Sequence, residues 1–427
     1  MAIIADLLRI VKLPRMIRVR QSFPAAEAGD IAAALRAELQ RPDIAGRVNK
    51  GMRIAVGVGS RGMAGIPLIA RVVVEELKRC GAHPFIVPAM GSHGGATAAG
   101  QRQVLASLGI TEASAGCPVV SSMDVVKLGE LDNGLPVLMD KAAAEADGIV
   151  VVNRIKAHSA FSGANESGLV KMITIGLGKQ KGADSCHALG FQHMADFIVK
   201  MARIGLRRAP VLFGVATIEN AYDRVVKITA VPAEAIIETE QALLLEAKAH
   251  MPRLLLQPID VLIVDQLGKE FSGSGMDSHI TGRASTACLT VGPQPNKLVV
   301  LDVTANSHGN AAGMGMADIA TRRLFAKINF DFTYANVLTS TTLQAARIPV
   351  LMDSDRLAIQ AAVKTCNATD PAVVRVVRIA NTLHVQEILV SESMLRDAER
   401  QPGLAVVGSP ADMVFDEAGN LRDIGRW

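Results

Sequence analysis

A glycine- and serine-rich segment at residues 156–187 carries an unusual share of titratable side chains. It contains His158, Glu166, Lys171 and His187, and it overlaps the end of GIVVVNRIKAH, whose apolar start is typical of a buried strand. Histidine changes its charge near neutral pH, and lysine can act as a nucleophile or as a charge partner. Such side chains just past the end of a strand predict acid–base chemistry on a small substrate.

A second histidine, His93, lies in another glycine-rich loop, GSHGGAT, and a third loop, GVGSRGMAG, contains Arg61. Glycines beside a histidine let a ligand approach closely, and the start of a following helix can hold a phosphate or a carboxylate. If the preceding apolar runs are parallel strands, all three loops lie at one edge of the sheet. His93 and His158 would then face each other as a pair suited to proton abstraction beside a carbonyl or carboxylate.

The pattern of apolar residues predicts such a sheet. A strand-like run at 52–59 is followed by a helical pattern at 66–81, then by the run HPFIVPAM and the helical pattern AAGQRQVLASLG. This alternation predicts an α/β fold with a mostly parallel sheet covered by helices. The second half has the same character, with strand-like runs at 259–268 and 296–304.

The length of 427 residues favours two domains. A helical pattern at 233–250 is followed by MPRLLLQP, whose prolines indicate a boundary. We therefore expect an N-terminal α/β domain over residues 1–252 and a C-terminal α/β domain over residues 253–427, with the last ~30 residues free to pack back on the first domain.

Composition disfavours several classes of function. The formal net charge is +4 and aromatic residues make up 3%, which disfavours nucleic-acid binding but suits a small anionic substrate. The five cysteines form no CxxC pair, which fits reduced thiols. No signal-peptide core begins the chain, and no uncharged apolar run reaches the ~18 residues of a membrane span. We therefore expect a cytoplasmic protein that does not contact a membrane.

Short motifs leave other functions open. Gly57, Gly59 and Gly62 match GxGxxG, but the next strand ends in PAMG without the acid that would bind a ribose. The stretch GKQ at 178–180 lacks the Ser or Thr of a P-loop, and HExxH does not occur. The alternatives to an acid–base enzyme are an NAD-type dehydrogenase of a small hydroxy acid and a non-catalytic protein that binds a small anion or a nucleotide.

The order and spacing of the polar residues resemble the nickel-pincer-dependent lactate racemase family. That family has an arginine in an early strand-end loop and a histidine in a GxH loop. A further histidine, a glycine-rich stretch, a lysine and another histidine follow. Here these residues are Arg61, His93, His158, Lys171 and His187, with Lys171 thirteen positions after His158. The resemblance covers the region from about residue 50 to about residue 200.

The resemblance implies a Rossmann-like N-terminal domain, a smaller C-terminal α/β domain and a site in the cleft between them. It implies a nickel-pincer nucleotide, which is a pyridinium-3,5-bisthiocarboxylic acid mononucleotide carrying nickel. Lys171 would form a thioamide with this cofactor and His187 would complete the nickel coordination, which suits the preference of Ni(II) for imidazole and sulfur donors. His93 and His158 would flank the substrate, and Arg61 would hold a reacting oxygen or a carboxylate.

The implied activity is that of a racemase or epimerase, which inverts the C2 centre of a 2-hydroxy acid by proton-coupled hydride transfer. Enzymes that synthesise the cofactor are implied as partners. Glu166 stands where glycine is usual in lactate racemases, which favours a divergent branch with another 2-hydroxy acid as substrate. Lys269, Ser272 and Glu166 are the candidates for substrate binding. The candidates for cofactor binding beside Lys171 are Gly91, Ser92, Gly94, Gly95 and Thr97.

Overall fold

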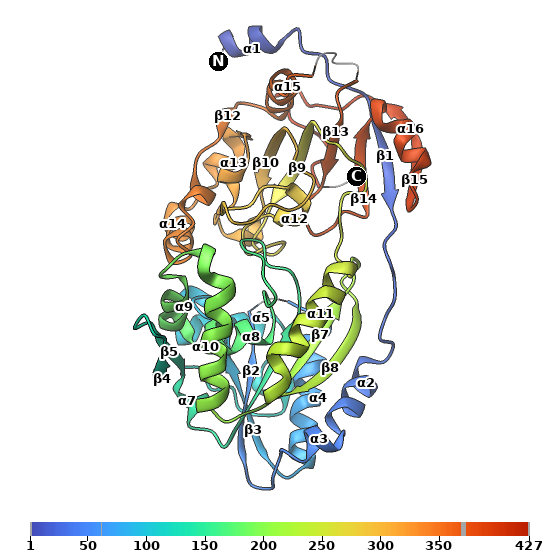
Figure 1. Ribbon diagram of the computed structural model, residues 1–427. Helices are drawn as coiled ribbons and strands as arrows, with labels where there is room; N and C mark the ends of the chain where they lie inside the picture. Colours follow the sequence, from blue (N-terminus) through green and yellow to red (C-terminus); the bar gives the residue numbers. More distant parts are fainter. Residues whose placement is uncertain (1, 61, 369–372, 426–427) are drawn as a thin grey trace. The chain divides into compact units, whose positions relative to one another are not determined.

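The computed structural model describes residues 2–60, 62–368 and 373–425 (Figure 1). The chain forms two compact units, an N-terminal unit of Pro24–Met251 and a C-terminal unit of Met1–Phe23 with Pro252–Trp427. Both units are α/β, and the C-terminal unit is the smaller, as expected from the sequence. None of the described helices combines the length and apolar character that crossing a membrane requires.

The N-terminal unit is built on a five-stranded sheet in the order β3-β2-β6-β7-β8. The first four strands are parallel and β8 is antiparallel to β7. Such strands are buried nearly throughout because helices cover both faces of the sheet. The strands are β2 (Arg53–Val58), β3 (His83–Pro88), β6 (Gly148–Arg154), β7 (Val211–Glu219) and β8 (Val225–Pro232), with a separate hairpin of β4 (Val125–Glu130) and β5 (Pro136–Asp140).

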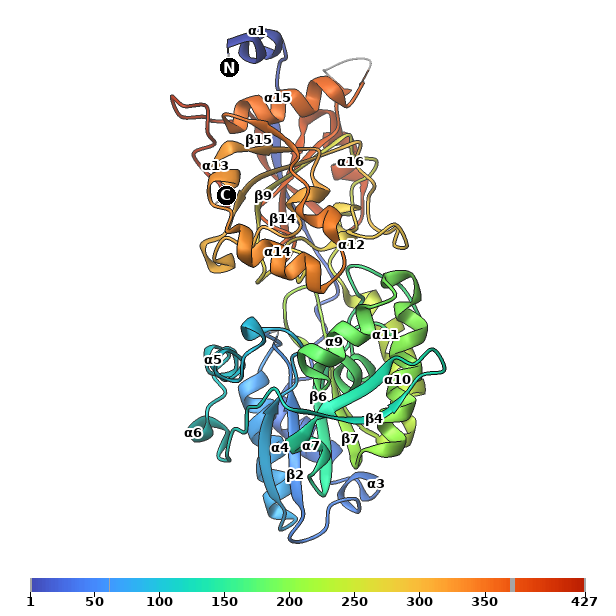
Figure 2. The ribbon, with the colours of Figure 1, turned by 90° about the vertical axis from the view of Figure 1, so that its left-hand side faces the viewer.

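The helices of this unit fall into two groups, one for each face of the sheet. They are α2 (Ile31–Leu39), α3 (Pro42–Ala45), α4 (Ile66–Arg79), η1 (Gly94–Ala96), α5 (Ala98–Ser107), α6 (Glu112–Ala115), α7 (Lys141–Ala144), α8 (Leu169–Lys171), the π-helix η2 (Met172–Gly176), α9 (Lys179–His187), η3 (Phe191–His193), α10 (Met194–Arg208), η4 (Ala233–Ala235) and α11 (Ile236–His250). Ile54 and Val56 pack with α2 and α4, whereas the intervening Ala55 belongs to the core that contains η2, α10 and α11. Figure 2 shows α4 and α10 on opposite sides of the sheet.

The C-terminal unit contains an eight-stranded sheet in the order β12-β11-β10-β9-β13-β14-β1-β15. The five strands from β12 to β13 are parallel, and the rest are antiparallel. The strands are β1 (Met16–Gln21), β9 (Val261–Leu267), β10 (Lys297–Val303), β11 (Ile319–Thr321), β12 (Val350–Met352), β13 (Val376–Ile379), β14 (Glu387–Ser391) and β15 (Leu404–Ala411). The helices are α1 (Ala2–Leu8), α12 (Ser278–Thr281), η5 (Ala305–Ser307), η6 (Met314–Met316), α13 (Arg322–Ala326), α14 (Phe330–Thr339), η7 (Leu343–Ala346), α15 (Asp355–Thr365), η9 (Glu392–Met394) and α16 (Leu395–Arg400).

Strand β1 lies in this second sheet, whereas the sequence pattern groups the first 252 residues in one domain. It pairs with both β14 and β15, and its side chains reach partners far along the chain, as from Arg20 to Glu387 over 367 positions. Residues Leu404–Ala411 likewise supply β15 to this sheet. No local pattern signals either pairing, because both depend on contacts between the two ends of the chain.

Candidate active site

The carboxyl ends of β2, β3 and β6 carry the three loops identified from the sequence. Because β2 lies between the other two strands, His93 and His158 follow strands on either side of it. Neighbouring strands are ~4.8 Å apart, so the two loops begin ~10 Å from each other. The hydroxyl of Ser60, in the loop after β2, is hydrogen-bonded to His93 Nδ1 and joins two of the loops directly. Arg61 lies outside the described residues.

A buried polar network holds the backbone of the His93 loop. Gln101 on α5 is fully buried, and its Nε2 donates to the carbonyls of Gly91 at 2.8 Å and His93 at 3.3 Å. Its Oε1 accepts from Lys179 Nζ at 3.1 Å, and Lys179 also donates to the Pro88 carbonyl at 2.6 Å. Sequence patterns missed this network, because a lysine or a glutamine carries no local signal of burial.

Lys179 completes the network with a buried ion pair. Its Nζ lies 3.0 Å from Asp140 Oδ2, and both side chains are fully buried. Burial lowers the pKa of Lys179, and the Asp140 carboxylate opposes that effect. Loss of either partner would leave a buried charge unpaired. The pair therefore ties β5 and α9 to the strand end that carries His93.

Gly94 and Thr97 shape the turn between β3 and α5. Gly94 has a φ of +66°, and a Cβ atom there would lie 2.6 Å from Gln101 N, so the position requires glycine. Thr97 caps α5, because its side chain accepts from Gly100 N at 3.0 Å. Local geometry thus accounts for both residues. Cofactor binding by the loop Gly91, Ser92, Gly94, Gly95 and Thr97 stays a prediction.

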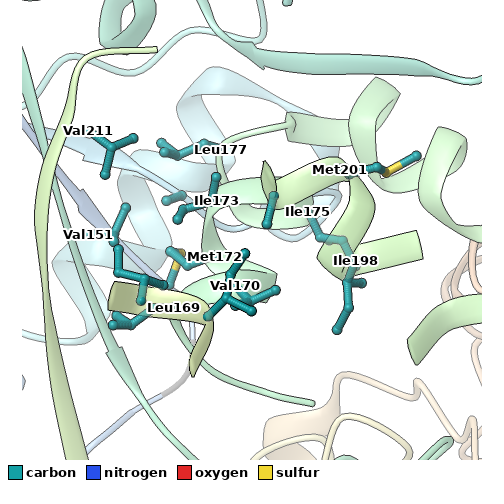
Figure 3. Close-up of a cluster of buried hydrophobic side chains, with 14 of the residues drawn as sticks. Val151, Leu169, Val170, Met172, Ile173, Ile175, Leu177, Ile198, Met201 and Val211 are labelled. Carbon is teal, nitrogen blue, oxygen red and sulfur yellow. The ribbon is translucent and has the colours of Figure 1, made fainter. Parts of the chain in front are cut away.

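Lys171 is presented by a helical segment anchored in the core. Helix α8 runs directly into the π-helix η2, and Leu169, Val170, Met172 and Ile173 belong to the buried cluster drawn in Figure 3. Lys171 interrupts this apolar run and is half-buried. A single π-helical turn is frequent at functional sites. The packing of its neighbours fixes the backbone of Lys171 while its side chain stays outside the apolar cluster.

His187, the last residue of α9, is held in one tautomer. Its Nδ1–H donates to the Ala183 carbonyl at 2.6 Å, which leaves the lone pair on Nε2. Burial lowers the pKa of His187, and the Lys171 ammonium lowers it further, although the Ala183 carbonyl opposes them. Burial also raises the pKa of the Cys186 thiol to about 12, although the Lys171 ammonium lowers the pKa of this thiol as well. Lys171 therefore lies near the end of α9, and His187 is neutral at pH 7.

Phe191 connects His187 to His158. Its ring centroid lies 5.3 Å from that of His187 and 6.0 Å from that of His158. Phe161 packs against His158 with a centroid distance of 4.5 Å. The structure thus groups His158, Lys171 and His187 beside an apolar surface made by two buried phenylalanines.

The donor chemistry at His187 fits a single protein ligand for a metal. Neutral imidazole is the form that binds metals, and a hydrogen bond from the other ring nitrogen to a backbone carbonyl orients it. Within the described ranges, no group of three or more His, Cys, Asp or Glu residues is placed to hold a metal. A single histidine ligand would suit a metal whose other donors come from an organic group, as the resemblance leads us to expect for nickel. Lys171 carries an amine of the kind that attachment of that group would require.

Glu166 holds its own loop and is not placed to contact a substrate. It is 1% exposed, and its Oε2 accepts from the His158 backbone N–H at 2.6 Å. Its Oε1 accepts from Ser162 Oγ and from Gly163 N, each at 3.1 Å. Lys248 Nζ on α11 donates to the same oxygen at 2.7 Å. The sequence predicts that Glu166 contacts the substrate. In the structure its carboxylate is instead buried and surrounded by donors of the protein itself.

The two substrate candidates in the C-terminal unit are engaged close to their own loop. Lys269 Nζ donates to the Gly273 carbonyl and to Asn336 Oδ1 on α14. Ser272 is buried, and its Oγ lies 3.1 Å from Ser274 Oγ. These contacts hold the loop against α14. Binding of a substrate carboxylate by Lys269 and Ser272 stays a prediction.

Glu240 on α11 holds the start of the helix that carries Lys171. It is 1% exposed, and its Oε2 accepts from Val170 N at 2.8 Å, while Asn165 Nδ2 donates to its Oε1 at 3.2 Å. A Cβ atom on Gly168 would crowd the Glu240 carboxylate, so glycine at this position allows the close approach of Glu240. Burial raises the pKa of Glu240 to about 7, although the hydrogen bonds favour the ionised carboxylate.

Replacement of Glu240 by glutamine is expected to remove a pH dependence of stability. Because the pKa in the folded protein is about 7 instead of the usual 4.5, folding favours the protonated carboxyl. This contribution to the free energy of unfolding is fully present at a pH below the unfolded pKa. It is lost as the pH rises through about 7, and the total loss is about 3 kcal/mol. In denaturant unfolding, the wild type should lose more stability than Glu240→Gln between about pH 4 and about pH 8.5. Equal losses in the two proteins would show that folding does not raise the pKa of Glu240.

Comparisons with known proteins connect the N-terminal unit to one family. The family model for the lactate racemase N-terminal domain matches residues 11–197, a range that includes His93, His158, Lys171 and His187. No curated protein sequence matches the chain. One similar solved structure is that of the lactate racemase apoprotein from Thermoanaerobacterium thermosaccharolyticum, with 14% identity, a TM-score of 0.45 and coverage of 79% of this chain and 82% of that chain. Residues 11–197 are therefore assigned to the lactate racemase N-terminal domain family.

Proposed function

We propose that this protein is a racemase or epimerase that inverts the C2 centre of a 2-hydroxy acid with a nickel-pincer nucleotide. The observation that carries the proposal is the grouping of Lys171, neutral His187 and His158 within a lactate racemase N-terminal domain. Each of these side chains has the chemistry that its proposed role requires.

Lys171 and His187 would hold the cofactor. The amine of Lys171 would form the thioamide bond, and Nε2 of His187 would coordinate the nickel, because its Nδ1–H is committed to the Ala183 carbonyl. When bound, the cofactor would supply a reversible hydride acceptor for the C2 carbon of the substrate. Phe161 and Phe191 would keep water away from this part of the site.

His158 and His93 would handle the oxygens and the proton of the substrate. The Ala160 backbone N–H donates to His158 Nδ1 at 3.1 Å, so the neutral ring carries its hydrogen on Nε2. This group can donate a hydrogen bond to a substrate oxygen. His93, hydrogen-bonded through Nδ1 to Ser60, would accept the hydroxyl proton on Nε2 and return it after inversion. Hydride and proton both leave and return, so the reaction involves no net oxidation.

The proposal implies a small anionic substrate and a set of partner enzymes. Arg61 would steady the carboxylate or the reacting oxygen of the substrate. The cofactor would come from dedicated biosynthetic enzymes, so protein produced without them is expected to be inactive.

A screen of paired enantiomers and epimers of 2-hydroxy acids tests the proposal. Protein produced with the cofactor-synthesis enzymes should carry about one nickel per chain, consistent with one histidine ligand. Chiral chromatography should then show conversion of one member of a pair into the other. Retained NAD without nickel, together with oxidation to the keto acid, would favour a dehydrogenase. A nickel-loaded protein that inverts no member of the panel would favour a binding protein.

A further inference from the structure

We propose that Glu166 and Lys248 form a clamp that positions His158 for the reaction, an inference that rests on the proposed racemase function. Both are positioning residues, because they act on the substrate only through His158. Their sequence separation of 82 positions means that the pair exists only in the folded protein.

The clamp acts on the backbone of His158 itself. Glu166 Oε2 accepts the His158 amide at 2.6 Å, while Oε1 receives Lys248 Nζ at 2.7 Å. The carboxylate is 1% exposed, whereas the lysine side chain is 34% exposed and reaches it from α11. A buried carboxylate with a charged partner and backbone donors forms strong, short hydrogen bonds. The histidine backbone is therefore fixed relative to α11.

Further contacts define the loop that the clamp holds. At its base, Lys156 and Ser167 form a two-way backbone bridge with N–O distances of 2.9 and 3.2 Å. Next to Glu166, Asn165 Nδ2 donates to the Ile237 carbonyl at 3.0 Å, and Gln241 Nε2 donates to Asn165 Oδ1 at 3.2 Å. Helix α11 thus binds one side of the loop at Asn165 and Glu166. Glu166 in turn accepts the amide of His158 on the other side of the loop.

Loss of the carboxylate would release the histidine. In Glu166→Gln one side-chain oxygen remains, so either the His158 amide or the Gly163 amide would face an NH2 group instead of an acceptor. A buried donor without an acceptor is costly enough for the loop to rearrange. A displacement of ~1 Å at a catalytic group can reduce a rate ~100-fold. Lys248 is needed as well, because its removal leaves the buried carboxylate without a counter-charge.

The test compares Glu166→Gln and Lys248→Met with a matched control, Glu246→Gln. Glu246 lies on the same helix and forms an ion pair of equal length, 2.7 Å, with Lys227 on β8. In the cofactor-free protein, amides of residues 157–166 should exchange hydrogen at least about tenfold faster in the two clamp variants and at the wild-type rate in the control. This measurement does not depend on activity.

In the cofactor-loaded enzyme, the clamp variants should lose ~10- to 100-fold in kcat, with KM changed less than ~3-fold and the Lys171 adduct intact. Lys248→Arg should restore most of kcat, because it restores the counter-charge. If Glu166→Gln does not fold, the Lys248→Met and Lys248→Arg pair decides the question. Wild-type exchange in the loop or wild-type kcat in folded clamp variants would overturn the inference. A wild-type protein without racemisation would instead contradict the proposed function, while the exchange measurement would still decide whether the clamp exists.

Discussion

Lys171→Ala is expected to yield protein without covalently bound cofactor, even when the cofactor-synthesis enzymes are present. The Lys171 ammonium lies close enough to Cys186 and His187 to lower the pKa of both groups. The packing of Val170 and Met172 in the apolar core fixes the backbone of Lys171. Without the bond, the cofactor would lose its fixed position, and racemisation should fall at least ~100-fold. Intact-mass measurement reports the adduct, and chiral analysis reports the rate.

The matched control for this change is Lys181→Ala. Lys181 lies on α9 near His187 but is exposed, so its loss should leave both the adduct and the rate unchanged. Peptide mapping should place the adduct of the wild type and of the control on Lys171. An adduct of the same mass on another lysine in Lys171→Ala would contradict the assignment of the attachment site.

His93→Ala and His158→Ala should each abolish racemisation while the adduct on Lys171 persists. Removal of a general acid or base typically reduces a rate ~10²- to 10⁴-fold, and each loop carries one of the two proposed groups. The adduct should persist because, in the proposal, Lys171 forms the covalent bond and His187 coordinates the nickel, and neither His93 nor His158 takes part in these two contacts. Rates should be measured at saturating substrate on protein with a verified adduct and nickel content.

His83→Ala is the control for both changes. His83 is exposed at the first residue of β3, at the opposite end of the strand from the loop that carries His93. Its loss should leave the rate unchanged. Full activity in His93→Ala or in His158→Ala would show that the two histidines do not act as the acid–base pair. A loss of nickel in either variant would show that the residue contributes to cofactor binding instead.

Much of the N-terminal unit could be predicted from local patterns. The runs at 52–59 and 66–81 became β2 and α4, and the pattern at 233–250 contains α11. Local periodicity is sufficient here because parallel strands and the helices between them follow one another in sequence. It also places the loops of His93 and His158 at one edge of the sheet, since parallel strands end on the same side.

Other features had no local signal. Strand β1 pairs with β14 and β15, so its place depends on the opposite end of the chain. Lys179 resembles a surface lysine in sequence, yet it is fully buried against Asp140. Glu166 resembled a group that selects a substrate, because its type was unusual in a glycine-rich loop. The partner that changes this interpretation, Lys248, lies 82 positions away.

The sequence by itself determined which residue types occupy the strand-end loops and in what order, because both follow from local periodicity and parallel topology. Only the tertiary structure decided which of these side chains face one another and which are held by buried partners. Phe191 against His158, Glu240 at the start of α8 and Lys248 on Glu166 are all contacts between residues far apart in the sequence. The physical reason is that burial and hydrogen-bond partners are properties of the packed core, where residues distant in sequence must satisfy one another's polar groups.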